Sequence, residues 1–343
     1  MSSTTRGTGQ TAGASDTAAP YGRTKKCAHL LFDNISSSVY NKEGLLKFFR
    51  KRNIYMRKWG DRRDAERIRN IDGVHAYMAY GMPKRTEAEV YINEKIDVTE
   101  LLRYIDEKNA SGERKVTLFH CFIAAVARTV KMRPLLNRYI SGKRYYMRRE
   151  ITMGFVVKKR FADSAEETLM IYRPKEDEAL VDIADKISGN VKKTKSGEEK
   201  QGADDILNVI KHFPKPIMNL FIWTLRFLDS HGLMPAAYTD VDTEYCTVLL
   251  SNLGSIKCDA VYHHLNNFGT NGIVITIGTI HKELMESESG EFVPRDTVNI
   301  GVTLDERIAD GFYFARSLKL VKHIFNNPEL LDKPLGEVID FEF

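Results

Sequence analysis

The order of β-like and helical segments constrains the fold of this chain more than any other feature. Apolar runs with strand character occupy residues 245–255, 272–280 and 296–304, and residues 88–98 alternate apolar and polar side chains. Helical patterns flank these runs, but strands and helices do not alternate one for one. A doubly wound sheet needs that alternation, so the sequence favours a two-layer α/β sandwich with a mixed sheet.

Local signals add a buried helix and a hairpin to this outline. Residues 117–132 are strongly apolar, with Thr117 as the expected N-cap and Pro134 just beyond the end. Residues 138–160 have the pattern of a hairpin, with Ser141–Gly142 as its expected turn.

The chain divides by composition into three parts. Residues 1–25 are rich in Ser, Thr, Gly and Ala, which predicts a disordered tail. Residues 26–73 are basic and mostly helical in pattern, which predicts a helical N-terminal extension. Residues 74–343 are long enough to bury a large core as one domain.

Charge and composition exclude several classes of protein. Hydrophobic residues make up 43% of the chain and charged residues 28%, as in ordinary globular domains. The net charge is +5, with 51 basic residues against 46 acidic ones, and no basic run is interleaved with aromatic residues. We therefore expect no nucleic-acid partner. A mild basic excess suits an anionic small ligand such as a phosphate-bearing cofactor.

The cysteines indicate neither a zinc site nor a disulfide framework. No two of them have CxxC spacing: Cys27, Cys121, Cys246 and Cys258. The N-terminus also lacks the apolar segment of a signal peptide. A cytoplasmic protein with reduced thiols is the expectation.

The most apolar stretch is IMNLFIWTLRFL, residues 217–228. It is too short to span a bilayer and it contains Arg226. This pattern predicts a buried or channel-lining helix, and we expect no membrane partner.

Charged residues are dense in VTLDERIADGFYFARSLKL, residues 302–320. Asp305, Glu306, Arg307 and Asp310 stand between a β-like run and a helix that is expected from about Gly311. Such a corner is either a cluster of salt bridges or the floor of a site.

Four stretches together resemble one known family. They are INEKIDVTELLRYI, TLFHCFIAAVARTVKMRPLLN, LLSNLGS and DERIADG followed by NNPELL, in that order between about residues 74 and 331. They resemble the catalytic core of the dihydrolipoyl acyltransferase (E2) components of 2-oxo acid dehydrogenases. That family has the chloramphenicol acetyltransferase-like fold, so the resemblance implies this fold here.

The resemblance also implies a reaction and an assembly. The family is trimeric, and CoA and the acyl donor or acceptor meet in a channel between subunits. A histidine of the motif Asp-His-Arg acts as general base, and the serine of Ser-Asn-Leu-Gly stabilises the oxyanion. The matching serine is Ser251, and Asp310 matches an aspartate whose salt bridge fixes the loop that holds the base.

Glu306 stands where the family has its histidine. An ordinary glutamate has a pKa of about 4.3 and a thiol one of about 8.5, so proton transfer between them is uphill by roughly 5–6 kcal/mol. Burial can raise the pKa of a carboxyl group toward neutrality. Glu306 is therefore either a structural acid in a corner that has lost catalysis, or a retuned base or carboxylate that binds an amine or hydroxyl.

The adjacent pair His263–His264 is a second candidate for the base. On a strand the two side chains would point to opposite faces, so at most one would face a site. Either one of them replaces the missing imidazole, or one packs at an interface while the other is solvated. No third ligand is near in the sequence, so no metal is expected.

Two functions remain open at this point. The first is a CoA-dependent acyltransferase with an unknown small acceptor, expected as a stand-alone homotrimer without a lipoyl lysine in this chain. The second is a catalytically inactive trimeric protein, a pseudoenzyme that binds acyl-CoA or serves as a scaffold. Residues 75–85 border the substrate channel in one reading, while in the other Lys84 and Arg85 are a solvated edge.

Overall fold

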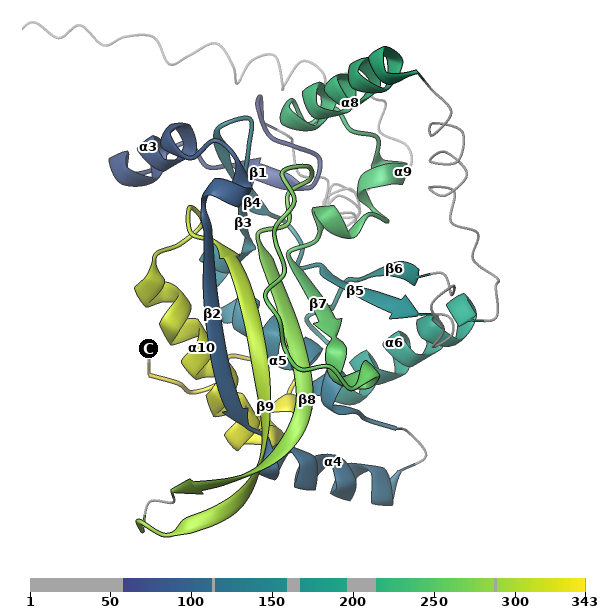
Figure 1. Ribbon diagram of the computed structural model, residues 1–343, viewed down its shortest axis with the longest axis vertical. Coiled ribbons are helices and arrows are strands. Elements are labelled where there is room, and N and C mark those ends of the chain that lie inside the picture. Colours follow the sequence, from purple (N-terminus) through teal and green to yellow (C-terminus); the bar gives the residue numbers. More distant parts are fainter. Residues whose placement is uncertain (1–57, 113–114, 159–166, 196–213, 287–288, 343) are drawn as a thin grey trace, which may run out of the picture. The chain divides into compact units, whose positions relative to one another are not determined.

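A computed structural model describes residues 58–112, 115–158, 167–195, 214–286 and 289–342 (Figure 1). The tail expected at 1–25 and the extension up to residue 57 lie outside these residues, so neither is tested.

A six-stranded sheet forms the centre of the described chain (Figure 1). Its strands, in spatial order, are β2 (Glu89–Asp97), β9 (Phe292–Asp305), β8 (Ile273–Glu286), β7 (Val248–Asn252), β5 (Met153–Lys158) and β6 (Glu167–Tyr172). β7 runs parallel to both β5 and β8, and the other pairs are antiparallel. The mixed sheet with helices on it confirms the predicted α/β sandwich.

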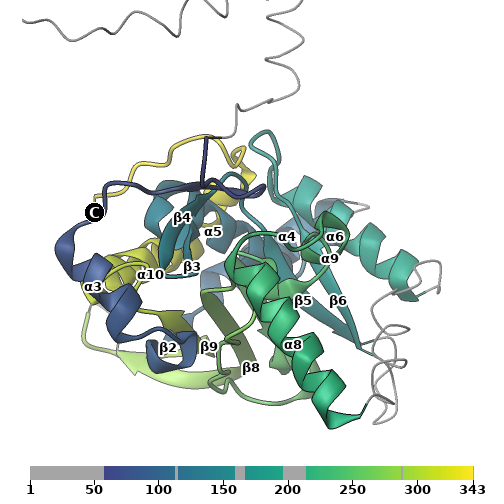
Figure 2. The same ribbon diagram turned by 90° about the horizontal axis from the view of Figure 1, so that it is seen from above.

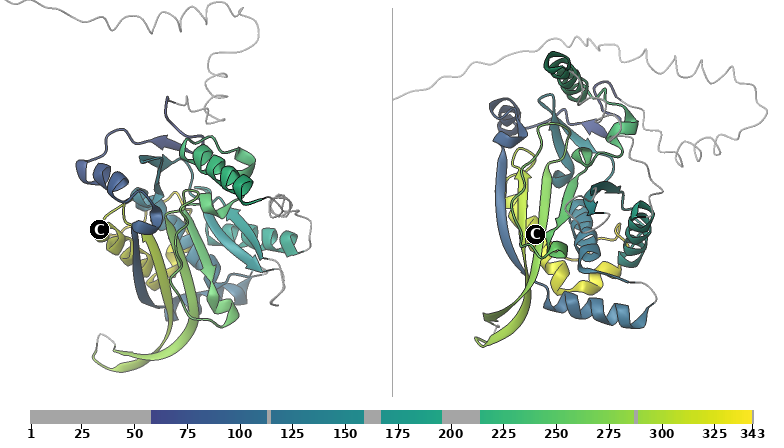
Figure 3. Two further views of the ribbon diagram at one scale, coloured as in Figure 1. Left: turned by 45° about the horizontal axis from the view of Figure 1, so that its top comes forward. Right: turned by 45° about the vertical axis from the view of Figure 1, so that its right-hand side comes forward.

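Four helices cover one face of this sheet (Figure 3): α4 (Thr99–Ser111), α5 (Leu118–Met132), α6 (Leu180–Lys195) and α10 (Gly311–Asn326). α5 is buried on all sides from His120 to Val130, which explains its uniformly apolar sequence. As predicted, Thr117 caps it, because its side chain accepts a hydrogen bond from the backbone N–H of His120.

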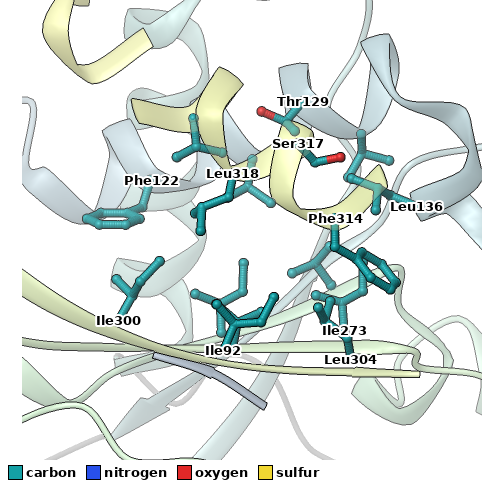
Figure 4. Close-up of a pocket in the computed structure, with 16 residues that line it drawn as sticks. Ile92, Phe122, Thr129, Leu136, Ile273, Ile300, Leu304, Phe314, Ser317 and Leu318 are labelled. Carbon is teal, nitrogen blue, oxygen red and sulfur yellow. The ribbon is translucent and has the colours of Figure 1, made fainter. Parts of the chain in front are cut away.

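The core between sheet and helices contains an apolar cavity of about 70 Å³ (Figure 4). Ile92 and Ile275 line it from the sheet, and Phe122 and Phe314 line it from α5 and α10. The only hydroxyl groups among its lining residues, those of Thr129 and Ser317, donate to carbonyls one helical turn earlier.

A small second sheet has the order β1 (Ala65–Arg67), β4 (Arg144–Arg148), β3 (Arg138–Ser141). The helical extension predicted through residue 73 is therefore wrong for this stretch. Tertiary packing decides it, because Ala65 is buried against Tyr139 and Tyr146 of the small sheet.

The hairpin prediction is confirmed for β3 and β4, but its turn lies one residue later. Ser141 pairs with Arg144, so Gly142 and Lys143 form a two-residue turn. Both have positive φ, 56° and 61°, as a type I′ turn requires. Lysine rarely adopts this conformation, which is why the sequence pointed to the preceding pair.

Shorter elements complete the described chain: α3 (Gly73–Gly81), η1 (Arg85–Glu87), η2 (Pro134–Asn137), α8 (Lys215–Ser230), α9 (Ala236–Thr239), η3 (Thr243–Tyr245), η4 (Leu253–Ile256) and η5 (Pro328–Asp332). α3 and α8 lie at one end of the molecule, as the view from above shows (Figure 2). α8 is the helix expected from the apolar run, but it is not buried, since only Asp229 on it is fully covered. Within the described residues, no helix has the length and apolarity needed to cross a membrane.

Candidate active site

Ser251 lies on the face of the sheet that the helices leave open. Its neighbour Leu250 is buried in the core, so the alternation of a strand turns Ser251 to the other face. Ser251 pairs with Thr276, which in turn pairs with Gly301. The Ser251 side chain is partly exposed, and its hydroxyl has no hydrogen bond to a described residue. The hydroxyl is therefore available to a ligand.

A loop from about Cys258 to Phe268 crosses this open face. It touches the strands directly, because a Cβ on Gly278 would lie 2.6 Å from the backbone N of Ala260, and one on Gly301 would lie 2.5 Å from the carbonyl O of Val261. Only glycine permits so close an approach.

The loop then reaches the far edge of the sheet. The Tyr262 ring lies 5.2 Å from the ring of Tyr91 on β2, measured between centroids. The backbone N–H of Leu265 donates to Oε1 of Glu89 at 2.6 Å. Glu89 pairs with Asp305, so the loop ends beside the charged corner.

Asp305 and Arg307 form the rigid part of that corner. Nε and Nη2 of Arg307 donate to the two carboxylate oxygens of Asp305 at 2.7 and 2.6 Å, and both side chains are buried. Nη1 of Arg307 donates to the carbonyl of Met82 at 2.7 Å. A bidentate pair of this kind fixes both position and orientation.

Arg85 is a second cation at this corner. Its Nε lies 3.7 Å from Oδ2 of Asp305, and its other nitrogens donate to the carbonyls of Asn266 and Gly269. Burial lowers the pKa of Arg85, an effect that the nearby Asp305 carboxylate opposes. The reading of this residue as a solvated edge is wrong. One feature of the sequence pointed to it, namely a basic residue directly before the strand that pairs with β9.

Glu306 follows Asp305 at the end of β9. Its backbone N–H donates to the carbonyl of Ala88 at 2.9 Å, while its side chain is partly exposed and makes no hydrogen bond or ion pair with a described residue. The backbone is thus fixed and the carboxylate is not. This arrangement suits a group that meets a ligand better than one that holds the corner together.

Asp310 has a different role from the one that the resemblance implies. It is the N-cap of α10, and its Oδ1 accepts a hydrogen bond from the backbone N–H of Tyr313 at 2.7 Å. It is exposed and forms no ion pair within the described part of the chain, so the expected salt bridge is not made there. Asp305 makes the ion pairs of this corner instead.

His263 and His264 lie in the crossing loop and not on a strand. Both are exposed, and their rings are stacked with centroids 4.8 Å apart. Nδ1 of His263 lies 2.9 Å from the carbonyl O of His264. The expectation that they point to opposite faces is wrong, because it assumed an extended strand. Directly after His264 the loop reaches the end of the sheet where Glu306 lies, since the N–H of Leu265 donates to Glu89.

Ser251 does not join Glu306 within one chain. Gly301 is level with Ser251 in the sheet, and Asp305 lies four residues further along β9 and two strands away. With a rise of about 3.3 Å per residue and about 4.8 Å between strands, their backbones are about 16 Å apart. Direct proton transfer needs about 3 Å.

A further histidine on the open side was not identified from the sequence. Nε2 of His281 lies 3.7 Å from Oδ2 of Asp259, and the amide of Asn299 donates to the same oxygen at 2.9 Å. The hydrogen bond from Asn299 lowers the pKa of Asp259, and burial acts against it. Within the described residues, no cluster of three histidine, cysteine or acidic side chains could hold a metal ion.

Comparison with known proteins adds a family to this geometry. The model of the 2-oxoacid dehydrogenases acyltransferase (catalytic domain) family matches residues 64–202 and 237–332, which is more than half of the chain. A curated relative is the lipoamide acyltransferase component of the branched-chain alpha-keto acid dehydrogenase complex of Bacillus subtilis (strain 168). It is 22% identical over 266 residues. The match covers 75% of this chain and 51% of the relative, so the chain spans about half the length of that protein.

Solved structures with the same fold include two acetyltransferases. The probable dihydrolipoamide acetyltransferase of Listeria monocytogenes superposes with a TM-score of 0.52 at 19% identity, over 76% of this chain and 95% of that one. The dihydrolipoamide acetyltransferase of Azotobacter vinelandii gives a TM-score of 0.52 at 15% identity, over 77% and 93%. At these identities the likeness shows the fold, and it confirms the fold that the four sequence stretches predicted.

Proposed function

Because the chain belongs to the 2-oxoacid dehydrogenases acyltransferase (catalytic domain) family, we propose that it is a CoA-dependent acyltransferase. It moves an acyl group between CoA and a small acceptor. The observation that carries this proposal is Ser251, whose hydroxyl has no partner in the described chain and stands on the open face of the sheet.

The reaction needs a base and a donor on either side of a thioester. The base takes a proton from the acceptor, whose nucleophilic atom attacks the thioester carbonyl. The Ser251 hydroxyl donates a hydrogen bond to the oxyanion that forms. The C–S bond then breaks, and the CoA sulfur leaves with the proton that the base holds.

The single base of this proposal is either Glu306 or one of His263 and His264. All three side chains are at least partly exposed, and the loop that carries the histidines reaches the end of the sheet where Glu306 lies. A carboxylate base suits an acceptor with an amine or hydroxyl group, to which it can also hydrogen-bond. Asp310 supports the base indirectly, because it caps the helix that follows Glu306.

The complete site lies between two subunits of a homotrimer in this proposal. The separation of about 16 Å between Ser251 and the Asp305 corner supports it, since one chain alone does not bring Ser251 and Glu306 together. A second copy supplies the missing half in a closed symmetric assembly.

The substitution at Glu306 favours a second candidate. A protein without the imidazole base binds acyl-CoA without turning it over, as a pseudoenzyme or scaffold. The intact Asp305–Arg307 pair is compatible with both candidates, because it stabilises the corner whether or not Glu306 reacts.

Release of free CoA thiol from a panel of acyl-CoAs tests the proposal, with amine, alcohol and thiol acceptors added in turn. We expect Ser251→Ala to lower kcat by about 10²–10³-fold. Among Glu306→Gln, His263→Ala and His264→Ala, the one that removes the base lowers it by about 10²–10⁴-fold. Glu291→Gln is the control, since Glu291 is exposed in the β8–β9 connection.

The outcome separates the two candidates. If the wild type releases no more CoA than Ser251→Ala with any acceptor, the enzyme proposal fails. Binding of acyl-CoA in calorimetry under the same conditions would then favour the pseudoenzyme.

A further inference from the structure

Helix α8 has two apolar faces, and the body of the protein covers only one. Met218, Phe221, Leu225 and Leu228 are partly buried at helical spacing. On the outer side Ile217, Leu220, Trp223 and Phe227 repeat at a similar spacing, and they are 51%, 63%, 62% and 44% exposed. A surface helix normally needs one apolar stripe. We therefore expect the second stripe to contact a surface outside the described chain.

The family core does not account for this helix. The family model matches up to residue 202 and resumes at 237, so α8 falls in the unmatched segment. Its outer face is therefore a feature of this chain and not of the shared catalytic domain.

The orientation of α8 is fixed at its C-terminal end. Asp229 is buried there, where Nη2 of Arg62 lies 3.5 Å from its Oδ1 and the Tyr245 hydroxyl donates to it at 3.0 Å. Ser230 lies against the β3–β4 turn, since a Cβ on Gly142 would lie 2.5 Å from its carbonyl O. The helix cannot rotate its outer stripe inward without breaking these contacts.

The charges on α8 are of one sign on its exposed surface. Lys215 and Arg226 are exposed and form no ion pair with a described residue. Asp229, the acidic residue of the helix, is buried and paired with Arg62. The outer face is thus apolar and cationic, with no exposed carboxylate.

Trp59 is a further exposed aromatic residue, close in sequence to the contact that holds the C-terminal end of α8. It is 91% exposed and stands three positions before Arg62, whose guanidinium contacts Asp229. Three residues span at most about 10 Å. Leu233, just past α8, is exposed as well.

We propose that the outer face of α8 docks on the surface of an anionic lipid bilayer. A helix with large apolar and aromatic side chains and with cations but no exposed acids matches the acyl–headgroup boundary of such a membrane. A helix of 16 residues lies in this interface and does not cross it. The sequence predicted a buried helix and no membrane partner, but the exposed second stripe favours one.

Pairing with a second copy through α8 fits the charges less well. In an antiparallel helix pair, Lys215 of one copy would approach Arg226 of the other, and α8 offers no exposed acid to compensate them. Nor do the described cavities form a groove along the outer face that would receive a protein helix.

Vesicle flotation of the full chain tests the proposal. We expect the protein to float with vesicles of phosphatidylcholine and phosphatidylglycerol in equal parts, and to stay below vesicles of pure phosphatidylcholine. Binding should weaken at least tenfold in high salt, because the attraction to the headgroups is screened. Trp59→Phe leaves Trp223 as the single tryptophan, and its emission should shift to the blue on binding.

Matched substitutions separate the α8 stripe from general hydrophobicity. Leu220→Glu should abolish flotation, and Arg226→Glu should weaken it at least tenfold. Leu284→Glu is the control, because Leu284 is 69% exposed on the β8–β9 hairpin far from α8. Circular dichroism verifies that each variant is folded.

Two results would overturn the proposal. One is a wild-type protein that remains unbound to anionic vesicles, or a Leu220→Glu variant that floats like the wild type. The other is an absence of wild-type flotation together with a lower particle mass of the Leu220→Glu variant in light scattering. That combination would show that a second copy covers the helix. Neither result depends on whether the chain transfers acyl groups.

Discussion

Adjacent acids at the corner of the sheet are held in opposite ways. Asp305 is buried between the guanidinium groups of Arg307 and Arg85, whereas Glu306 is fixed only through its backbone. A buried carboxylate needs such partners, because an unpaired charge in the interior is very costly. The free carboxylate of Glu306 can instead respond to a ligand.

Arg85 is predicted to stabilise the fold through this corner. We expect Arg85→Met to lower the free energy of unfolding by about 2–3 kcal/mol, since the carbonyls of Asn266 and Gly269 would lose their donor. Urea unfolding measures this difference. Arg103→Met is the control, because Arg103 forms only exposed pairs on α4 and should cost less than about 1 kcal/mol. Equal losses in the two variants would contradict the buried role of Arg85.

At the scale of elements, the N-cap of helix α10 is Asp310, the residue for which the family resemblance implies a salt bridge. Asp310 accepts from the N–H of Tyr313 and precedes a glycine at the first helical position. An N-cap needs a short side chain with an acceptor oxygen, and its charge is secondary. The sequence pattern located this helix correctly, because caps and apolar spacing are local signals.

Substitution of Asp310 tests whether its hydrogen bond at the N-cap or its negative charge stabilises the protein. Asp310→Ala should reduce the free energy of unfolding by about 1 kcal/mol, while Asp310→Asn should stay within a few tenths of the wild type. Thermal or urea unfolding of both variants provides the comparison. If Asp310→Asn lowers the free energy of unfolding as much as Asp310→Ala does, the negative charge itself is needed.

Helix α8 illustrates the limit of reading burial from apolarity. Its sequence is apolar over most of its surface, which is usual for a buried helix, yet its outer side chains are exposed. The pattern identified the helix correctly but not its surroundings, because apolarity alone does not say whether the protein itself or another surface covers a face.

At the scale of the whole molecule, the sheet separates the elements of the candidate site. Ser251 lies level with Thr276 and Gly301, and the corner with Glu306 lies beyond the end of β9. The crossing loop that carries His263 and His264 contacts Thr276, the neighbour of Ser251, through Val261, and then reaches Glu89 beside that corner. In the proposed acyltransferase, Ser251 and Glu306 therefore come from different subunits.

Mixed assemblies test this arrangement directly. Ser251→Ala is co-expressed with whichever base variant is inactive by itself. In a trimer whose sites each take the serine from one subunit and the base from its neighbour, random mixing restores both groups in about one quarter of the sites. We expect about that fraction of the wild-type kcat. Activity no greater than that of the separate variants would show that the two groups of one site do not come from neighbouring subunits.

The sequence by itself determined the mixed α/β fold, the capped helix α5, the position of α10 and the motifs that carry Ser251 and Glu306, since these follow from local periodicity, capping and short motifs. Tertiary structure decided the burial of Arg85, the strand β1 in place of a helix and the distance between Ser251 and Glu306. Each of these depends on residues that are distant in the chain and become neighbours only when the sheet is paired, so no local pattern contains them.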